Sequence, residues 1–221
     1  MKIQAVAFDL DGTLYPNYKM YFHSVPFFLA HPRLVSHFGR IRTTIRTIRP
    51  VRNFRGLQAE LLAISLKVTV EKAAELIERN IYGRWEETFR RITAFPGIHE
   101  LLERLNGQGL KLAVISDLPV ERKLRFLKLE GLFDCAFSAE ETGYLKPNPE
   151  PFLELAGRLG LSPGDIMYVG NNYKYDILGA KEVGMKSAHL TGKRIADSKA
   201  DLTFSSYAQL EDSILEHIHA S

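Results

Sequence analysis

Short apolar runs near the start and in the second half of the chain predict buried strands. Ile3 to Phe8 is interrupted only by Gln4, and similar runs follow at Leu110 to Ile115, Ile166 to Val169 and, more weakly, Lys186 to Leu190. Runs of this length, rich in apolar and β-branched residues and ended by polar ones, are typical of strands buried on both faces. The pattern therefore predicts four strands, widely separated in the sequence.

Two segments between these runs have the spacing of amphipathic helices. Their apolar residues stand at positions i, i+3, i+4 and i+7, namely Ile98, Leu101, Leu102 and Leu105, and then Phe152, Leu155, Ala156 and Leu159. Asn148 and Pro149 supply a start for the second helix, and Gly160 supplies its end. Because parallel neighbours need a crossover connection, usually a helix, the alternation predicts an α/β protein with a doubly wound parallel sheet.

The segment from about Tyr18 to Phe89 has no comparable strand pattern. Isoleucines at 41, 45 and 48 keep helical spacing, and arginines at 42, 46 and 49 repeat it one residue later, which predicts a helix with adjacent apolar and basic stripes. Pro50 is expected to end this helix. Leu61 to Arg79 is also helix-like, being rich in Ala, Leu, Glu and Lys. We expect a helical insertion between the first strand and the rest of the sheet.

Charge separates this insertion from the remainder of the chain. Between Leu14 and Phe95 there are 14 Lys and Arg against 6 Asp and Glu, whereas the remainder has 15 against 20. No acidic residue occurs between Asp11 and Glu60, an interval that contains Arg33, Arg40, Arg42, Arg46, Arg49, Arg52 and Arg55. Three interpretations stay open: a solvated surface as the default, contact with or steering of an anionic substrate, and, least favoured, nucleic-acid binding, because no recognised module accompanies the charge.

Length and composition narrow the class of protein. With 221 residues, 45% hydrophobic and 25% charged, the chain has a globular composition, and its single cysteine, Cys135, excludes an internal disulfide framework. No apolar run approaches the roughly 18 residues of a membrane span, and acidic residues come too early for a signal peptide. We expect a soluble cytoplasmic protein without a membrane partner; the sequence does not indicate its oligomeric state.

The first candidate for chemistry is the sequence DLDGT, residues 9–13, directly after the first predicted strand. Residues i and i+2 of an extended chain point the same way, so Asp9 and Asp11 can face one pocket at the carboxyl end of that strand. Two such carboxyl groups can divide phosphoryl transfer, one attacking phosphorus and the other protonating the leaving oxygen. A plain Asp-Gly turn remains an alternative, whereas a calcium loop does not, because Leu14 and Met20 occupy its glycine and glutamate positions.

Further polar residues follow other predicted strands or precede helices. Ser116 closes one strand, Lys146 precedes a Pro-Asn-Pro stretch, and Asn171 with Asp176 follows another strand, where oxygen ligands can hold a hard cation. Each has a simpler reading taken alone: a helix cap for Ser116, a solvated charge for Lys146, and an acid favoured by the helix dipole for Asp176.

Taken in order, the four motifs DLDGT, ISD, KPNP and VGNNYKYD resemble the haloacid dehalogenase (HAD) superfamily, in its phosphatase-like branch. The resemblance covers the chain except the insertion. It implies a Rossmann-like parallel sheet with a mobile helical cap between the first and second motifs. We therefore expect a catalytic core at residues 1–15 and 96–221 and an all-helical cap at residues 16–95.

The resemblance also implies roles for individual residues. Asp9 is the expected nucleophile and Asp11 the general acid/base, with a pKa that partial burial draws toward neutrality. Ser116 is expected to bond a phosphoryl oxygen, and Lys146 to neutralise charge between Asp9 and the phosphoryl group. The expected Mg²⁺ ligands are Asp9, Asp11 through its backbone carbonyl, Asn171 and Asp176. The expected substrate-binding residues are Thr13, Ser116 and Asp117, together with Arg42 and Arg46, which the basic stripe and not the resemblance suggests.

One position departs from the family pattern. The fourth motif usually begins Gly-Asp, but Gly170 is followed here by Asn171, so the metal site has one negative charge fewer. Asp11 argues against the halide-releasing branch, which protonates no leaving alkoxide. The sequence thus predicts a magnesium-dependent phosphatase that hydrolyses a small phosphorylated metabolite through an aspartyl-phosphate. A phosphomutase, or a weakly active binding or regulatory protein of the same fold, remains as the alternative.

Overall fold

The core of the molecule is a parallel sheet with strand order β3-β2-β1-β4-β5-β6 in the computed structural model, which describes residues 3–193 and 195–219. The strands are β1 (Ala5–Phe8), β2 (Lys111–Ser116), β3 (Cys135–Ser138), β4 (Ile166–Gly170), β5 (Lys186–Leu190) and β6 (Leu202–Phe204). The four strands predicted from apolar runs are confirmed, as is the doubly wound parallel sheet. The sequence pattern missed β3 and β6 because both are edge strands whose apolar runs are too short to stand out, Cys-Ala-Phe-Ser and Leu-Thr-Phe.

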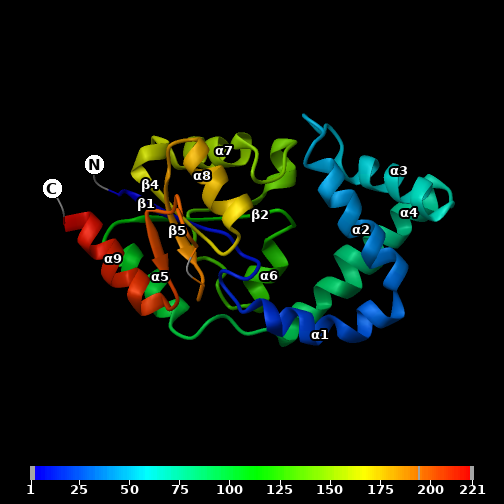
Figure 1. Cartoon of the computed structure of the whole chain (residues 1–221). Helices are drawn as coiled ribbons and strands as arrows, with labels where there is room; N and C mark the ends of the chain where they lie inside the picture. The colour runs from blue at the N-terminus through cyan, green and yellow to red at the C-terminus, as the bar shows by residue number, and fades with distance from the viewer. Residues whose placement is uncertain (1–2, 194, 220–221) are drawn as a thin grey trace.

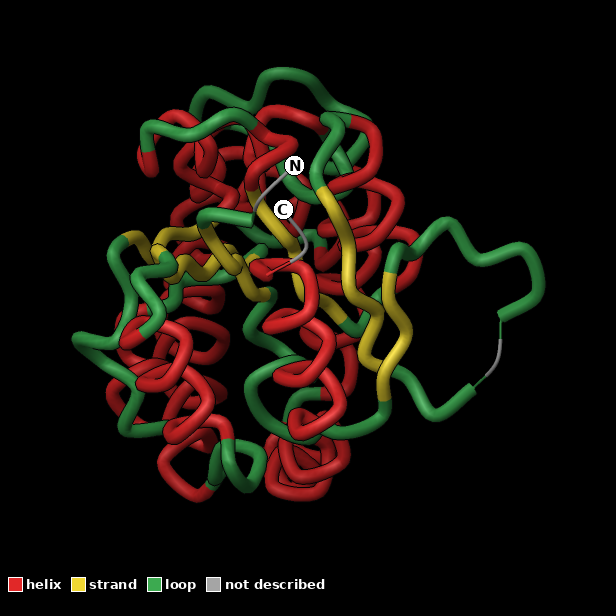
Figure 2. Tube along the Cα trace, turned by 90° about the vertical axis from the view of Figure 1, so that its left-hand side faces the viewer, coloured by secondary structure: helices red, strands yellow, loops and turns green. Residues whose placement is uncertain are grey.

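Helices cover both faces of the sheet (Figures 1 and 2). Alternate residues of β1 enter different cores: Val6 and Phe8 belong to one buried cluster, and Ala5 and Ala7 to the other. The first cluster also contains apolar residues of α5 (Ile98–Gly107), α6 (Glu121–Phe126) and α9 (Tyr207–His219), and the second those of α7 (Pro149–Leu159) and α8 (Leu178–Glu182). The twofold period of an extended chain thus fixes which helices pack on which face. Both α5 and α7 match the helices predicted from apolar spacing.

The expected helical insertion lies on the side of the core toward which β1 runs (Figure 1). Its elements are α1 (Asn17–Ala30), α2 (Pro32–Ile45), α3 (Phe54–Leu66), α4 (Val70–Leu76), η1 (Ile77–Trp85) and η2 (Thr88–Arg91). The two segments that connect it to the core meet where the Phe95 amide donates to the Leu14 carbonyl at 2.9 Å. This contact agrees with the boundaries predicted at residues 15/16 and 95/96, which stay a prediction.

The basic helix of the insertion ends earlier than predicted. Helix α2 stops at Ile45, five residues before Pro50. The following amides, those of Thr47 and Ile48, bond to carbonyls three residues back, which tightens the chain into a turn. The Arg46 carbonyl instead accepts a hydrogen bond from Asn148 Nδ2 of the core at 3.4 Å. Pro50 has no N–H to offer this carbonyl, so the contact with the core satisfies an acceptor that a longer helix would have left open.

The predicted helix over Leu61 to Arg79 is also interrupted. Lys67 has a φ of 56°, which ends α3, and Thr69 then caps α4 by accepting a hydrogen bond from the Lys72 amide at 3.2 Å. No helix among residues 3–193 and 195–219 has the length and apolar content needed to cross a membrane.

The strand order determines where a site can form. Strand β1 is central, with β2 on one side and β4 on the other, so the connections from its neighbours leave in opposite directions. In open parallel sheets such a switch point leaves a crevice outside the carboxyl ends of the strands, and this is where ligands bind. Asp9 follows β1 at this position.

Candidate active site

Three buried charged residues meet at the switch point. Lys146 Nζ lies 2.7 Å from Asp9 Oδ1 and 2.6 Å from Asp176 Oδ1, and it donates to the Tyr168 hydroxyl at 3.1 Å. Lys146 precedes α7, whereas Asp176 lies in η5 (Tyr173–Ile177), which follows β4. Exposure is 6% for Asp9, 3% for Lys146 and 1% for Asp176. A single ammonium group therefore forms ion pairs with two buried carboxylates.

Because Asp9 is buried and one lysine faces two carboxylates, the pKa of Asp9 is raised. Burial and the negative charge of Asp176 raise the pKa of Asp9 from 3.8 to about 7, against the opposing effect of Lys146. Burial alone would lower the pKa of Lys146, but its two carboxylate partners raise it well above its ordinary value. The Thr13 hydroxyl donates to Asp9 Oδ2 at 2.9 Å and fixes the orientation of that carboxylate.

Two glycines permit this close arrangement. Gly12 has a φ of 89°, and a Cβ at this position would overlap the side-chain amides of Asn17 and Asn171. A Cβ at Gly170 would overlap the side chain of Asp176. Gly12 is therefore required mainly by its positive φ, and Gly170 by the closeness of the Asp176 Cβ.

Asp11 has a different environment from Asp9. Its carboxylate accepts hydrogen bonds from the Tyr15 hydroxyl at 2.6 Å, the Ser116 hydroxyl at 2.7 Å and Lys123 Nζ at 2.7 Å. Burial acts to raise the pKa of Asp11, but the charge of Lys123 and these hydrogen bonds outweigh it, so the pKa is lowered. The expectation that burial draws this pKa toward neutrality is wrong, because it overlooked the lysine.

Lys123 is the main site residue that the sequence did not reveal. It lies on α6, is 2% exposed and is separated from Asp11 by 112 positions. In the sequence it belongs to the stretch Glu121-Arg122-Lys123, which has the composition of a solvated helix surface. Only the packing of α6 beneath the site turns this side chain inward, so no local signal could have identified it.

The polar pocket is a cavity of about 260 Å³ lined by most of the predicted residues. Its walls include Asp9, Asp11, Arg46, Asp117, Lys146, Asn171 and Asp176. Asn17 also lines it, a residue that sequence reasoning did not select. Within the described part of the chain, no three His, Cys, Asp or Glu side chains form a metal-binding group. Any cation in this pocket would rest on the carboxylates of Asp9 and Asp176, with amide and backbone oxygens in addition.

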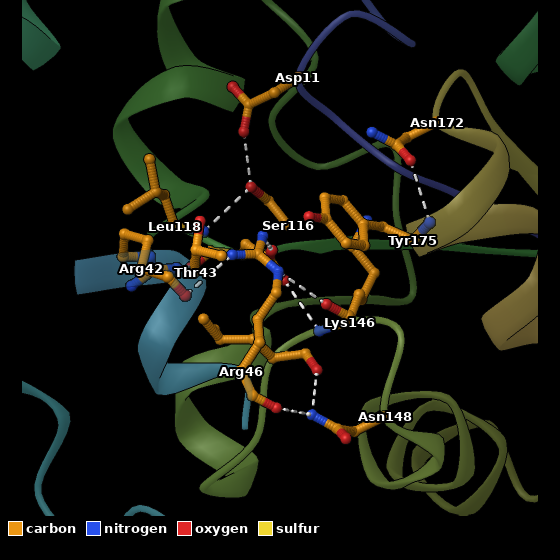
Figure 3. A network of polar contacts seen from close by, with 12 residues as sticks. Asp11, Arg42, Thr43, Arg46, Ser116, Leu118, Lys146, Asn148, Asn172 and Tyr175 are labelled. Carbon is orange, nitrogen blue, oxygen red and sulfur yellow. Dashed lines mark hydrogen bonds and ion pairs between the residues drawn. The ribbon is translucent and has the colours of Figure 1, made fainter. Parts of the chain in front are cut away.

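Three predicted residues, Ser116, Thr13 and Arg42, bind neighbouring groups instead of lining this pocket. Ser116 closes β2, donates to Asp11 and accepts the Leu118 amide at 3.2 Å, as Figure 3 shows. Thr13 is fully buried against Asp9. Their expected contacts with substrate stay predictions.

Arg42 of α2 and Arg46, the residue that caps this helix, connect the insertion to the core. Arg42, 8% exposed, pairs with Glu140 and donates to the Asp117 carbonyl. Arg46 pairs with the Asp117 carboxylate, donates to the Lys146 carbonyl at 3.0 Å and stacks over Tyr175 at 4.4 Å (Figure 3). The solvated-surface interpretation is therefore wrong for these two, whereas it describes the exposed side chains of Arg33, Arg40, Arg49 and Arg52. Arg55 is exposed as well, but it pairs with Glu78 and lies over the Tyr82 ring. A role of Arg42 and Arg46 in substrate binding stays a prediction.

Asp117 joins these arginines to the backbone of Lys146. Its second carboxylate oxygen accepts the backbone amide of Lys146 at 3.1 Å. The position of Lys146 thus depends on a carboxylate that also holds the insertion. Asp117 lines the polar pocket, but its charge is already balanced by Arg46.

Comparison with known proteins agrees with this geometry. Residues 6–190 match the family described as haloacid dehalogenase-like hydrolase. The chain is 30% identical over 218 residues to a phosphoglycolate phosphatase of Mannheimia succiniciproducens, covering 95% of this chain and 97% of that protein. It is 30% identical over 195 residues to the pyrophosphatase PpaX of Halalkalibacterium halodurans, covering 85% and 83%.

Solved structures give the same result for the fold. A 2-haloacid dehalogenase from Pseudomonas syringae pv. Tomato DC3000 superposes with a TM-score of 0.73 at 27% identity, covering 96% of this chain and 98% of that chain. The family match runs from within β1 to the end of β5 and so contains every motif residue described above. The chain therefore belongs to the haloacid dehalogenase-like hydrolases.

Proposed function

We propose that this protein is a magnesium-dependent phosphatase that hydrolyses a small phosphomonoester through an aspartyl-phosphate on Asp9. The observation that carries the proposal is the arrangement of Asp9 and Asp11, which line one polar pocket while their partners differ. Asp9 is held by Lys146 and Thr13, whereas Asp11 is held by Lys123. Names of the matched relatives, a phosphoglycolate phosphatase and a pyrophosphatase, support phosphate compounds as the substrate class.

The residues of the polar pocket fit Mg²⁺. Two buried carboxylates, those of Asp9 and Asp176, face one ammonium group, which leaves negative charge uncompensated. Proteins commonly bind Mg²⁺ through one or two carboxylates, with water and substrate phosphate oxygens completing the octahedron. We assign Asp9, Asp176, Asn171 and the Asp11 carbonyl as its ligands. Bound there, Mg²⁺ would lower the pKa of Asp9 and withdraw charge from the phosphoryl oxygens as a Lewis acid.

In the first half-reaction, an oxygen of Asp9 attacks phosphorus and the bond from phosphorus to the ester oxygen breaks. Lys146 balances the negative charge that gathers between Asp9 and the phosphoryl group. Asp11 gives its proton to the leaving oxygen. Asp11 has a lowered pKa before substrate binds, but a phosphoryl dianion beside it raises that pKa, which supplies the acid form when it is needed.

In the second half-reaction, a water molecule attacks phosphorus and the bond to Asp9 breaks. Asp11, now a carboxylate, accepts the proton of that water. The hydrogen bonds from Lys123 and Tyr15 stabilise this base form. The same residue therefore serves as acid and then as base.

A panel of phosphomonoesters, assayed for phosphate release with Mg²⁺ and with EDTA, tests the proposal. Metal-dependent release that is abolished in a folded Asp9→Asn variant is the expected result. Release that persists in the variant would contradict the nucleophile, and an absence of release on all esters would favour a binding or regulatory protein.

Two further assays on the same protein distinguish the proposed phosphatase from two other reactions of the family. Incubation with sugar phosphates distinguishes a phosphomutase, because it yields an isomer instead of free phosphate. Chloride release from 2-chloropropionate is the matching test for a dehalogenase. Asp11 is the observation against that reaction, since a leaving halide needs no proton.

A further inference from the structure

A second cavity, which we name the apolar pocket, lies beside the polar pocket. It has a volume of about 310 Å³, near the lower end of the 300–1,000 Å³ or so of small-molecule sites. The two pockets share lining residues, namely Asp11, Met20, Tyr21, Arg46 and Asp117, so they form one continuous space. Among the residues expected to hold the phosphoryl group and the cation, Asp9, Lys146, Asn171 and Asp176 line the polar pocket and not the apolar one.

Aromatic and aliphatic side chains of the insertion form most of the apolar pocket. Phe27 and Phe28 come from α1, Phe38 from α2 and Trp85 from the end of η1. Phe27 and Trp85 are stacked, with ring centroids 6.4 Å apart and an interplanar angle of 10°. Flat, largely preformed surfaces of this kind bind aryl or alkyl groups, because such groups leave water on entering them.

No free positive charge is available in the apolar pocket for an anionic leaving group. Every lining residue is described by the structure, and the two cations among them, Arg42 and Arg46, are already paired with Glu140 and Asp117. A carboxylate or a second phosphate in this space would have to compete with those ion pairs. The pocket therefore disfavours small charged alcohols such as glycolate.

The position of Asp11 gives the direction of the substrate. Asp11 is the residue that protonates the leaving oxygen in the proposed reaction, and it lines both pockets. A phosphomonoester with its phosphorus at Asp9 and its ester oxygen at Asp11 therefore extends its alcohol portion toward the apolar pocket.

We propose that the substrate is a phosphomonoester of an apolar alcohol, whose aryl or alkyl group fills the apolar pocket. This inference rests on the proposed phosphatase function and specifies its substrate class. The aromatic and aliphatic side chains of the apolar pocket contact the alcohol portion alone, so they set specificity without taking part in the chemical step.

Gly39 offers a way to fill the pocket without disturbing the fold. It lies on the stripe of α2 that also contains Val35, Phe38, Arg42 and Arg46, all of which line the pocket. A Cβ at Gly39 would meet no atom within 4 Å. Gly39→Leu therefore places a side chain in the cavity, and it replaces a poor helix former by a good one.

Gly157 provides the matched control. It lies within α7 of the core, is exposed, and a Cβ there would likewise meet no atom within 4 Å. Gly157→Leu makes the same chemical change in a helix that contributes no residue to the apolar pocket.

The experiment measures kcat/KM for straight-chain alkyl phosphates from methyl to octyl, with 2-phosphoglycolate for comparison. The wild-type value should rise about threefold to fourfold per methylene until the pocket is full, and hexyl phosphate should exceed 2-phosphoglycolate. Gly39→Leu should flatten the series, and Gly157→Leu should keep it. A flat wild-type series, a preference for 2-phosphoglycolate, or an unchanged slope in Gly39→Leu would overturn the inference.

The affinities of the corresponding alkylphosphonates, which are not hydrolysed, are measured by calorimetry. They allow the phosphatase function and the apolar subsite to be tested separately. Phosphate release without any dependence on chain length in either assay refutes the apolar subsite and leaves the phosphatase. Phosphonate affinity that rises with chain length, without hydrolysis of any ester, refutes the phosphatase and retains the subsite. Neither release nor length-dependent binding refutes both.

Discussion

Replacing Asp9 by asparagine is expected to stabilise the metal-free protein, although it removes the proposed nucleophile. Burial and Asp176 raise the pKa of Asp9 from 3.8 to about 7 in the folded protein. The unfolded chain binds fewer protons than the folded one between these two values, so the free energy of unfolding falls as the pH rises from about 4 to about 7. Below this pH range Asp9 is protonated in both the folded and the unfolded state, so it does not lower the free energy of unfolding.

The pKa values set the size of the effect. A change from 3.8 to about 7 corresponds to about 4 kcal/mol of stability lost above pH 7. Asparagine cannot ionise and avoids this loss, but it also gives up the ion pair with Lys146. The figure of about 4 kcal/mol is thus an upper limit for the gain of Asp9→Asn at pH 8.

Urea unfolding followed by circular dichroism in EDTA, at several pH values between 4 and 8, measures this difference. The variant should match the wild type near pH 4 and exceed it increasingly toward pH 8, and added Mg²⁺ should stabilise the wild type more than the variant. Asp212→Asn, the same change at an exposed residue of α9, is the control. A difference that does not change with pH, or a variant that is less stable at pH 8, would refute the charge argument.

Other positions give further expected outcomes. Lys123→Met leaves burial as the main influence on the pKa of Asp11, so that pKa should rise. The kcat/KM should fall by about tenfold or more, and its pH profile should shift to higher pH. An unchanged pH profile would show that Lys123 does not influence catalysis. Gly12→Ala should destabilise the fold by more than about 1 kcal/mol in chemical denaturation, because of its positive φ and two overlapping amides; an unaffected midpoint would contradict this. Gly170→Ala should displace Asp176 and weaken Mg²⁺ binding at least severalfold by calorimetry, and an unaltered affinity would argue against Asp176 as a ligand.

Local pattern was sufficient for the central strands and for the residues that follow them. Strand β1 is apolar on both faces because it lies between two helical layers, and this produces the continuous run that predicts it. Asp9 and Asn171 stand directly after such strands and Ser116 is the last residue of one, so their common location at one sheet edge follows from parallel strand order. Edge strands β3 and β6 lack this double burial and left no comparable signal.

The arginines show where local pattern was insufficient. Arg42 and Arg49 occupy equivalent places in the predicted basic stripe, yet Arg42 is buried against Glu140 and Arg49 is exposed. The difference arises because α2 ends at Ile45, so the helical stripe stops at its C-cap, Arg46, and does not reach Arg49. A helical period predicts which residues share a face, but not which neighbour that face meets.

The sequence by itself determined the fold class, the family and most of the charged residues around Asp9. Those features depend on periodicity and on residues a few positions apart, which a linear sequence contains. The tertiary structure determined the ion-pair partners and the pKa of each carboxyl group. Asp9 and Asp176 share one lysine across 137 and 30 positions, while Asp11 has its own lysine from α6, and this division makes the two neighbouring aspartates electrostatically different. Burial and long-range ion pairs set pKa values, so two carboxylates that are equivalent in the sequence become distinct only when the chain folds.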